Sequence, residues 1–316
     1  MPSVLVTGAG GFIGRRVVSA ASHAGYRVSG IVRQATSLAG AGTVIQHDLR
    51  NPLNGPPSAD WVFHLAGGYA GAGEKELDRV DAQTAHNVID WGFAAGIKNW
   101  IFASAAEVYG DVCGIANEEA PQHPVIPYGW LKLTVEHLFA ERLKTLSNHR
   151  IVILRIGEVY GRDGRLIREL TARMKRGFCP WPGSGHVLLS FVHVDDVAQA
   201  FLCAARTAPM GISVYNVADD MPVTWQGFLL RVAQLLGTKS PAFLPVSLVQ
   251  AYALCSALAH RATRTEPILT MHALRLLLTP KAVSNARLKS ALGFKPQYPT
   301  ISEGLEETFR GLSHDS

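Results

Sequence analysis

The N-terminal part of the chain alternates short apolar runs with one longer amphipathic stretch. Val4–Thr7 is an apolar run that predicts a strand, and it leads into the glycines of TGAGGFIG. The stretch RRVVSAASHAG, residues 15–25, has the spacing of a helix that ends near its glycine. YRVSGIVR, residues 26–33, predicts a second strand. The pattern therefore indicates strand, glycine turn, helix and strand, in that order.

Three further apolar runs continue this alternation. TVIQHDL predicts a strand that ends at Asp48, WVFHLAGG one that ends near Ala66, and NWIFAS one that ends at Ser104. Helical stretches lie between the later runs. Such alternation predicts an α/β fold with a Rossmann-type doubly wound parallel sheet, in which ligands bind at the C-terminal ends of the strands. The segment FASAAEVYG, residues 102–110, is therefore expected at the rim of a ligand cleft.

Composition narrows the class of protein. The 316 residues are 47% hydrophobic and 17% charged, which allows one large domain or two that share a cleft. The net charge of +5 comes from scattered Lys and Arg, so we expect no nucleic-acid partner. The four cysteines form no CxxC pair, which predicts neither a metal site nor disulfides and fits a cytoplasmic location. The uncharged residues 240–260 include two prolines and fall short of a membrane span.

The glycine turn favours a bound dinucleotide. Gly8, Gly11 and Gly14 lie between a strand and a helix, where glycines allow a tight turn, close approach of a pyrophosphate and packing of helix on strand. An acid at the end of the second strand would bind the ribose hydroxyls of NAD, whereas an arginine accommodates the 2′-phosphate of NADP. Arg33 follows Val32 there, with no acid. NADP(H) is therefore predicted in preference to NAD(H), with a merely solvated Arg33 as the alternative.

Motifs along nearly the whole chain resemble those of one enzyme family. They are TGAGGFIG at 7–14, HDL at 47–49, HLAG at 64–67, AAEVYG at 105–110, PYGWLK at 127–132, LRIGEVYG at 154–161 and FVHVDDVAQA at 191–200, with YNVADDMPVTW and LGFKPQYPTISEGLEETF further on. Together they resemble the extended short-chain dehydrogenase/reductases, the NAD-dependent epimerase/dehydratase family. The resemblance implies a mainly NADP-binding domain over residues 1–160. A smaller C-terminal α/β substrate-binding region covers most of 161–316, with 186–220 returning to the Rossmann sheet.

Tyr128 and Lys132 carry the predicted chemistry. Because they are four residues apart, they share one face of a helix, and the ammonium near the phenol favours the ionised form of the phenol. Such a tyrosine passes a proton to or from a carbonyl or hydroxyl while the nicotinamide takes or gives hydride. The resemblance adds that Lys132 holds the nicotinamide ribose. An ordinary amphipathic helix with an exposed lysine is the alternative.

The resemblance also assigns further cofactor contacts. The glycine segment contributes its backbone, Asp48 and Leu49 lie beside the adenine, the HLAG segment follows the ribose and pyrophosphate, and Ile156 lies near the carboxamide. The predicted cofactor-binding residues are Gly8, Gly11, Phe12, Ile13, Gly14, Arg33, Asp48, Leu49, Leu65, Ala66, Gly67, Tyr128, Lys132 and Ile156.

FASAAEVYG departs from the family pattern at one position. The family usually has Ser or Thr five residues before the glycine of VYG, where this chain has Ala105. That hydroxyl orients the reacting oxygen, and losing such a donor costs on the order of 3 kcal/mol in the transition state. Ser104 stays a catalytic candidate, although on a regular strand it would point away from the substrate unless a bulge or turn redirects it. Glu107 is expected to move a proton or to bind a substrate hydroxyl, with a solvated loop acid as the alternative.

Glu158 bears on the substrate. Nucleotide-sugar members usually have an Asn at this position and commonly an Arg near Ser190. A carboxylate repels a diphosphate, so a nucleotide sugar is the less favoured substrate. We place Ala105, Glu107 and Glu158 in the substrate site. The apolar segments PVSLVQAYALCSALAH and ILTMHALRLLL resemble those of members that act on sterols, flavonoids and other apolar alcohols or ketones, although the same segments would also fill a core.

These observations predict an NAD(P)(H)-dependent oxidoreductase that transfers hydride at a hydroxyl or ketone carbon of a small, partly apolar molecule. Tyr128 is its acid/base. Two alternatives stay open: a nucleotide-sugar epimerase or dehydratase, and a catalytically weak NADPH-binding sensor or partner protein. Family members commonly pair through the helices that flank the Tyr128 helix, so a homodimer is expected.

Overall fold

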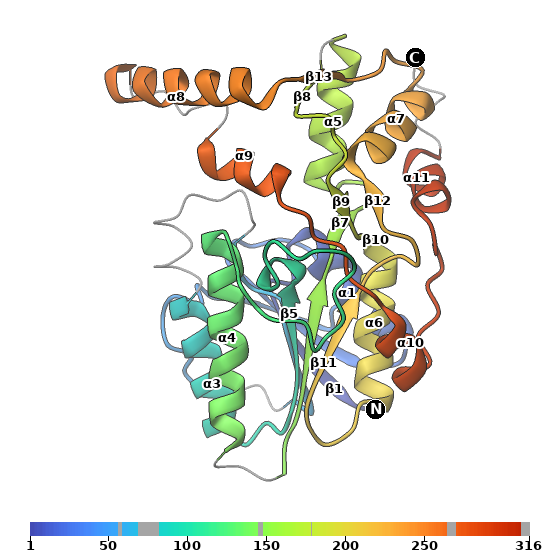
Figure 1. Ribbon diagram of the computed structural model, residues 1–316. Helices are drawn as coiled ribbons and strands as arrows, with labels where there is room; N and C mark the ends of the chain where they lie inside the picture. Colours follow the sequence, from blue (N-terminus) through green and yellow to red (C-terminus); the bar gives the residue numbers. More distant parts are fainter. Residues whose placement is uncertain (56–58, 69–81, 145–147, 178, 264–269, 311–316) are drawn as a thin grey trace.

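A seven-stranded sheet lies in the lower part of the molecule as drawn in Figure 1, between two layers of helices. The computed structural model describes the chain apart from residues 56–58, 69–81, 145–147, 178, 264–269 and 311–316. Within the sheet the strand order is β11-β6-β5-β4-β1-β2-β3, and all neighbouring strands are parallel. The strands are β1 Ser3–Thr7, β2 Arg27–Val32, β3 Thr43–Gln46, β4 Trp61–His64, β5 Asn99–Ala105, β6 Arg150–Ile156 and β11 Gly211–Val217. The predicted Rossmann-type doubly wound sheet is confirmed.

Helices cover both faces of this sheet. One face packs against α1 and α6, and the other against α3 and α4. The helices beside the sheet are α1 Phe12–His23, α3 Ala82–Ala94, α4 Pro127–Leu143, α6 Val194–Thr207 and α10 Ala286–Leu292. Burial on both faces explains why β5 is a continuous apolar run rather than an alternating one.

Strand β5 shows how the chain divides between the two faces. Trp100 and Phe102 belong to the core beneath α3 and α4, whereas Ile101 and Ala103 belong to the core beneath α1 and α6. The strand ends in the short 3₁₀ helix η2, Ala106–Val108. It therefore delivers the AAEVYG segment to the C-terminal edge of the sheet, where doubly wound folds bind ligands.

The C-terminal half adds short strand pairs and further helices above this edge (Figure 1). The pairs are β7 Glu158–Tyr160 with β10 Phe191–His193, β8 Pro180–Pro182 with β13 Ala242–Leu244, and β9 Leu188–Leu189 with β12 Val223–Thr224. The helices are α5 Arg165–Lys175, α7 Trp225–Leu236, α8 Val246–Thr263, α9 Met271–Leu278 and α11 Ile301–Phe309. A second apolar core, rich in aromatic side chains such as Trp225 and Phe228, lies among them. The predicted domain boundaries stay a prediction.

No helix in the described part of the chain is both long and apolar enough to cross a bilayer. Among the same residues, no group of three His, Cys, Asp or Glu side chains is arranged to hold a metal ion.

Candidate active site

The glycine turn is held against the end of β4. Gly8 has a φ of +67°, which favours glycine, and a Cβ there would lie 2.8 Å from the Ala66 nitrogen. Leu65 and Ala66 donate their backbone N–H groups to the Thr7 hydroxyl oxygen at 3.2 and 3.1 Å. That hydroxyl pairs with His64 Nδ1 at 2.8 Å, and burial, with repulsion from Lys132, lowers the pKa of His64 to about 3. His64 is therefore neutral, and its ring together with the two backbone N–H groups holds the Thr7 hydroxyl at the turn.

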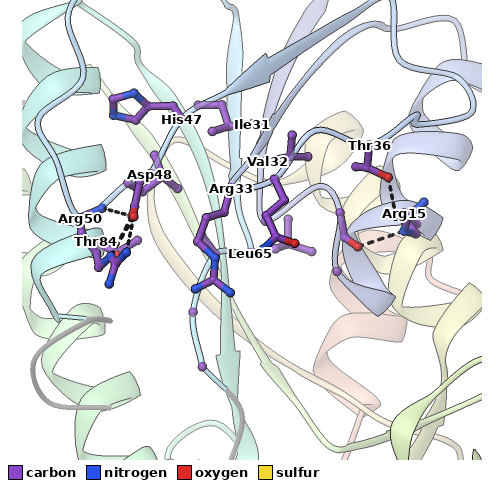
Figure 2. Close-up of a pocket in the computed structure, with 18 of the residues that line it drawn as sticks. Arg15, Ile31, Val32, Arg33, Thr36, His47, Asp48, Arg50, Leu65 and Thr84 are labelled. Carbon is purple, nitrogen blue, oxygen red and sulfur yellow. Dashed lines mark hydrogen bonds and ion pairs between the residues drawn. The ribbon is translucent and has the colours of Figure 1, made fainter. Parts of the chain in front are cut away.

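A cavity of about 620 Å³ opens above this turn (Figure 2). Eight of the predicted cofactor residues line it: Gly8, Gly11, Arg33, Asp48, Leu49, Leu65, Ala66 and Gly67. The other predicted contacts lie outside its lining. Phe12 packs against Gly164, Ile13 and Ile156 join the core beneath α1 and α6, and a Cβ on Gly14 would lie 2.1 Å from the Gly8 carbonyl oxygen. Gly14 thus allows the start of α1 to pack against the glycine turn after β1.

Three arginines surround the cavity, and one aspartate offsets part of their positive charge. Arg15 is held in place because its Nε donates to the Gly10 carbonyl at 3.0 Å and its Nη2 to the Thr36 hydroxyl at 3.0 Å. Arg50 pairs with Asp48, and this hydrogen bond lowers the pKa of Asp48 to about 2. Arg33 extends between these two groups (Figure 2). The cavity therefore carries a surplus of positive charge.

Tyr128 and Lys132 lie on the inward side of α4, next to the end of β5. The Lys132 ammonium is buried, donates to the Ala103 carbonyl at 3.0 Å, and lies 5.5 Å from the centre of the Tyr128 ring. Gly129 lets α4 approach η2, because a Cβ there would lie 2.5 Å from the Glu107 carbonyl oxygen. The predicted Tyr–Lys face is thus brought against the AAEVYG segment.

The Ser104 hydroxyl is hydrogen-bonded to a buried carboxylate of α4. The hydroxyl donates to Glu136 on α4 at 2.5 Å, and Arg155 on β6 donates to the same carboxylate at 2.6 Å. All three side chains are buried. The hydroxyl is therefore committed to an ion pair inside the fold, and Ala105, also buried, provides none in its place.

The two predicted substrate-site carboxylates share one cation. Lys281 donates to Glu107 at 2.9 Å and to Glu158 at 3.1 Å. The Ser190 hydroxyl donates to the Val283 carbonyl at 3.0 Å, so this position adds no charge to the site. The site is accordingly built from segments far apart in the sequence.

Several of these residues escaped sequence reasoning. Arg15 directly follows the glycine segment, so its position in the sequence is enough to suggest a place beside the cofactor. Arg50 likewise directly follows the HDL motif, whereas Thr36 lies in a loop with no motif. Lys281 contacts residues more than a hundred positions earlier in the chain. Only the folded chain brings that lysine to the carboxylates.

The family can now be stated from this geometry and from comparison with known proteins. The sequence profile of the NAD dependent epimerase/dehydratase family matches residues 4–218. The chain belongs to this family. The resemblance drawn from its motifs is confirmed, and the protein is an oxidoreductase of the NAD dependent epimerase/dehydratase family.

Several proteins named for an enzyme activity are similar to nearly the whole chain. A 3-diazoavenalumate denitrifying reductase from Streptomyces sp is 28% identical, and the match covers 96% of this chain and 98% of that protein. The sterol-4-alpha-carboxylate 3-dehydrogenase, decarboxylating, of Mus musculus is 25% identical, with 98% and 90% covered. Among solved structures, MoeE5 in complex with UDP-glucose and NAD superposes with a TM-score of 0.78 at 25% identity, covering 98% of this chain and 97% of that one. The family thus spans several substrate classes on one fold.

Proposed function

We propose that this chain is an NADP(H)-dependent oxidoreductase that interconverts a hydroxyl and a ketone on a small, partly apolar substrate, with Tyr128 as proton donor or acceptor. The observation that carries the proposal is the buried Lys132 ammonium, 5.5 Å from the Tyr128 ring at the C-terminal edge of the sheet. A bound nicotinamide would supply the hydride. The chain's part is to hold the cofactor and to exchange the proton at the Tyr128 hydroxyl.

The preference for NADP(H) rests on charge. Arg33, directly after β2, and Arg15, anchored to Gly10 and Thr36, both line the cavity. Arginine pairs well with a phosphate through parallel N–H groups, and Thr36 adds a hydroxyl. These three side chains are the groups that we assign to the 2′-phosphate.

We infer the substrate class from Glu158, which we place in the substrate part of the site. Glu158 disfavours a diphosphate in the position where nucleotide-sugar members have an amide. The mouse relative is named as a sterol dehydrogenase and the Streptomyces relative as a reductase, so neither name implies a nucleotide sugar. A carbonyl or secondary alcohol on an apolar framework is therefore our preferred substrate.

Replacing Tyr128 by Phe tests the proposed proton transfer. The variant is expected to lose at least a hundredfold in kcat for NADPH-dependent carbonyl reduction, because no other group is assigned to give the proton. Its dissociation constant for NADPH should stay within twofold. Tyr252→Phe, on the exposed face of α8, is the control and should keep full activity. An active Tyr128→Phe enzyme would sink the proposed role.

A nucleotide-sugar epimerase or dehydratase is the second candidate. MoeE5, solved with UDP-glucose, favours it. Such an enzyme regenerates its bound dinucleotide in each cycle, whereas a reductase consumes NADPH in proportion to product. Measuring the NADPH oxidised per molecule of product separates the two, since one per product supports our proposal and none supports the alternative.

A further inference from the structure

Lys281 lies between two carboxylates at the substrate end of the site. Its ammonium is 2.9 Å from Glu107 and 3.1 Å from Glu158, and its side chain is only 4% exposed. The three residues come from η2, from the start of β7 and from the segment after α9. This triad is separate from the glycine turn, which we assign to the cofactor, and from Tyr128 and Lys132, which we assign to proton transfer.

Lys281 stays positively charged within this triad. Burial alone would lower the pKa of Lys281, but the two carboxylates together outweigh burial and raise it above its ordinary value. The lysine is therefore a cation shared by two acidic side chains, and the group of three has two formal negative charges against one positive charge. Ser190 brings no compensating charge, since it is neutral and donates to the Val283 carbonyl.

Apolar side chains adjoin the triad at the start of α4, the helix that carries Tyr128. Glu107 and Lys281 line a small cavity together with Val125, Ile126 and Leu276. Ile126 comes two residues before Tyr128 and directly precedes α4. Glu158, with 26% of its side chain exposed, is the most accessible of the three charged groups. A substrate at Tyr128 would thus meet an apolar wall that ends in carboxylate oxygens.

We propose that the Glu107–Lys281–Glu158 triad is a selectivity element that accepts a hydrogen-bond-donating hydroxyl or amine of the substrate and excludes a carboxylate or phosphate. It rests on the proposed oxidoreductase function and adds a preference for the charge of the substrate. That preference would set this chain apart from the mouse relative, whose name denotes a carboxylate substrate. Lys281 positions the two acids rather than binding an anion, because both of its contacts are already with carboxylates. An incoming anion would have to displace one of them against the remaining negative charge.

A set of three ketones with the same framework and different charges tests the selectivity. 4′-(Hydroxymethyl)acetophenone, 4′-(aminomethyl)acetophenone and 4-acetylbenzoate share one carbonyl and differ in the charge of the para substituent. Their dissociation constants are measured by calorimetry on the full chain saturated with NADP⁺, so that no turnover is needed. The hydroxymethyl and aminomethyl ketones should each bind at least tenfold more tightly than the carboxylate.

Glu158→Gln removes one charge at the most accessible member of the triad. The preference for the aminomethyl ketone over the carboxylate should fall at least fivefold, which a purely structural cross-link would not produce. Glu141→Gln, the same change at an exposed carboxylate paired with Lys144 on α4, should leave the preference unchanged. The selectivity role is overturned if the carboxylate binds as tightly as the others, if none of the three ketones binds, or if Glu158→Gln has no effect. Failure of the oxidoreductase function would appear separately, as the absence of NADPH oxidation when the wild type is mixed with a ketone that it binds.

Discussion

At the scale of single residues, Ser104 and Ala105 differ because their side chains leave β5 in opposite directions. Successive residues of a strand face opposite sides of the sheet. Ser104 faces α4 and donates to Glu136, while Ala105 takes the other direction without a hydroxyl. Alternation already predicted that Ser104 turns away, but only the fold reveals the buried carboxylate that binds it. We therefore leave Ser104 out of the proposed proton transfer.

Ala105→Ser tests whether the chemistry still follows the family route. A restored donor to the reacting oxygen should raise kcat by about 10- to 100-fold, because oxyanion donors contribute a few kcal/mol to the transition state. The measurement is steady-state NADPH oxidation with the hydroxymethyl ketone. Ala106→Ser, which places the hydroxyl one residue later, should give no increase. An unchanged kcat in Ala105→Ser would favour the alternative of a catalytically weak NADPH-binding protein.

Arg33→Ala tests the predicted choice of cofactor. Losing the guanidinium should weaken NADP⁺ binding by about tenfold or more, since an arginine–phosphate pair is among the stronger charge-assisted contacts. NAD⁺ affinity should change less than twofold, because NAD⁺ has no 2′-phosphate. Both constants come from fluorescence titration, with Arg27→Ala at the opposite end of β2 as control. Equal losses for the two dinucleotides would contradict the assignment.

At the scale of elements, α4 combines catalytic and structural roles on one face. Tyr128, Lys132 and Glu136 follow one another at a spacing of four residues, so they line up along the helix. Glu136 pairs with Arg155 on β6, and Arg155 also donates to the Tyr109 hydroxyl at 3.0 Å. This buried pair ties α4 to the sheet below the proposed proton donor.

Breaking the pair on one side should destabilise the protein strongly. Arg155→Met leaves the Glu136 carboxylate buried without its cation, and the free energy of unfolding should fall by about 3–5 kcal/mol. The double variant Glu136→Leu/Arg155→Met should recover most of that loss, because apolar replacements remove the unpaired charge. Urea unfolding measures both.

The exposed pair of Lys144 and Glu141 provides the control. Lys144→Met should change the free energy of unfolding by less than about 1 kcal/mol, as is usual for solvent-exposed pairs. A loss in Arg155→Met no larger than in this control would show that the buried pair does not anchor α4.

At the scale of the whole molecule, packing of the C-terminal half on the sheet buries acids that ordinarily stay in water. Asp219 follows β11, is 2% exposed, and accepts from the Tyr160 hydroxyl at 3.3 Å. Burial first, and then the nearby Asp196, raise the pKa of Asp219 to about 8. The folded protein therefore holds a proton that the unfolded chain releases near pH 4.

Stability should consequently depend on pH through Asp219. Because its folded pKa is raised, its contribution is fully present below about pH 4 and is lost as pH rises towards 8, with a slope approaching about 1.4 kcal/mol per pH unit. His64 acts with the opposite sign between pH 3 and 6.5, since its folded pKa is lowered. Comparing urea unfolding of the wild type and Asp219→Asn from pH 5 to 8.5 isolates the aspartate. Parallel curves would show that Asp219 does not titrate as described.

The sequence by itself determined the local features of this protein. Apolar periodicity and glycine spacing specify the strand–turn–helix units, and the spacing of Tyr128 and Lys132 places both on one helical face, because these relations span only a few residues. The family followed from such local motifs, including AAEVYG with its missing hydroxyl.

The tertiary structure alone decided which distant groups meet. Glu136 with Ser104, Arg15 with Thr36, and Lys281 with its two glutamates are joined by contacts whose partners have no fixed spacing along the chain. Burial then sets the charge state of His64 and Asp219, and burial is a property of the packed molecule rather than of any segment.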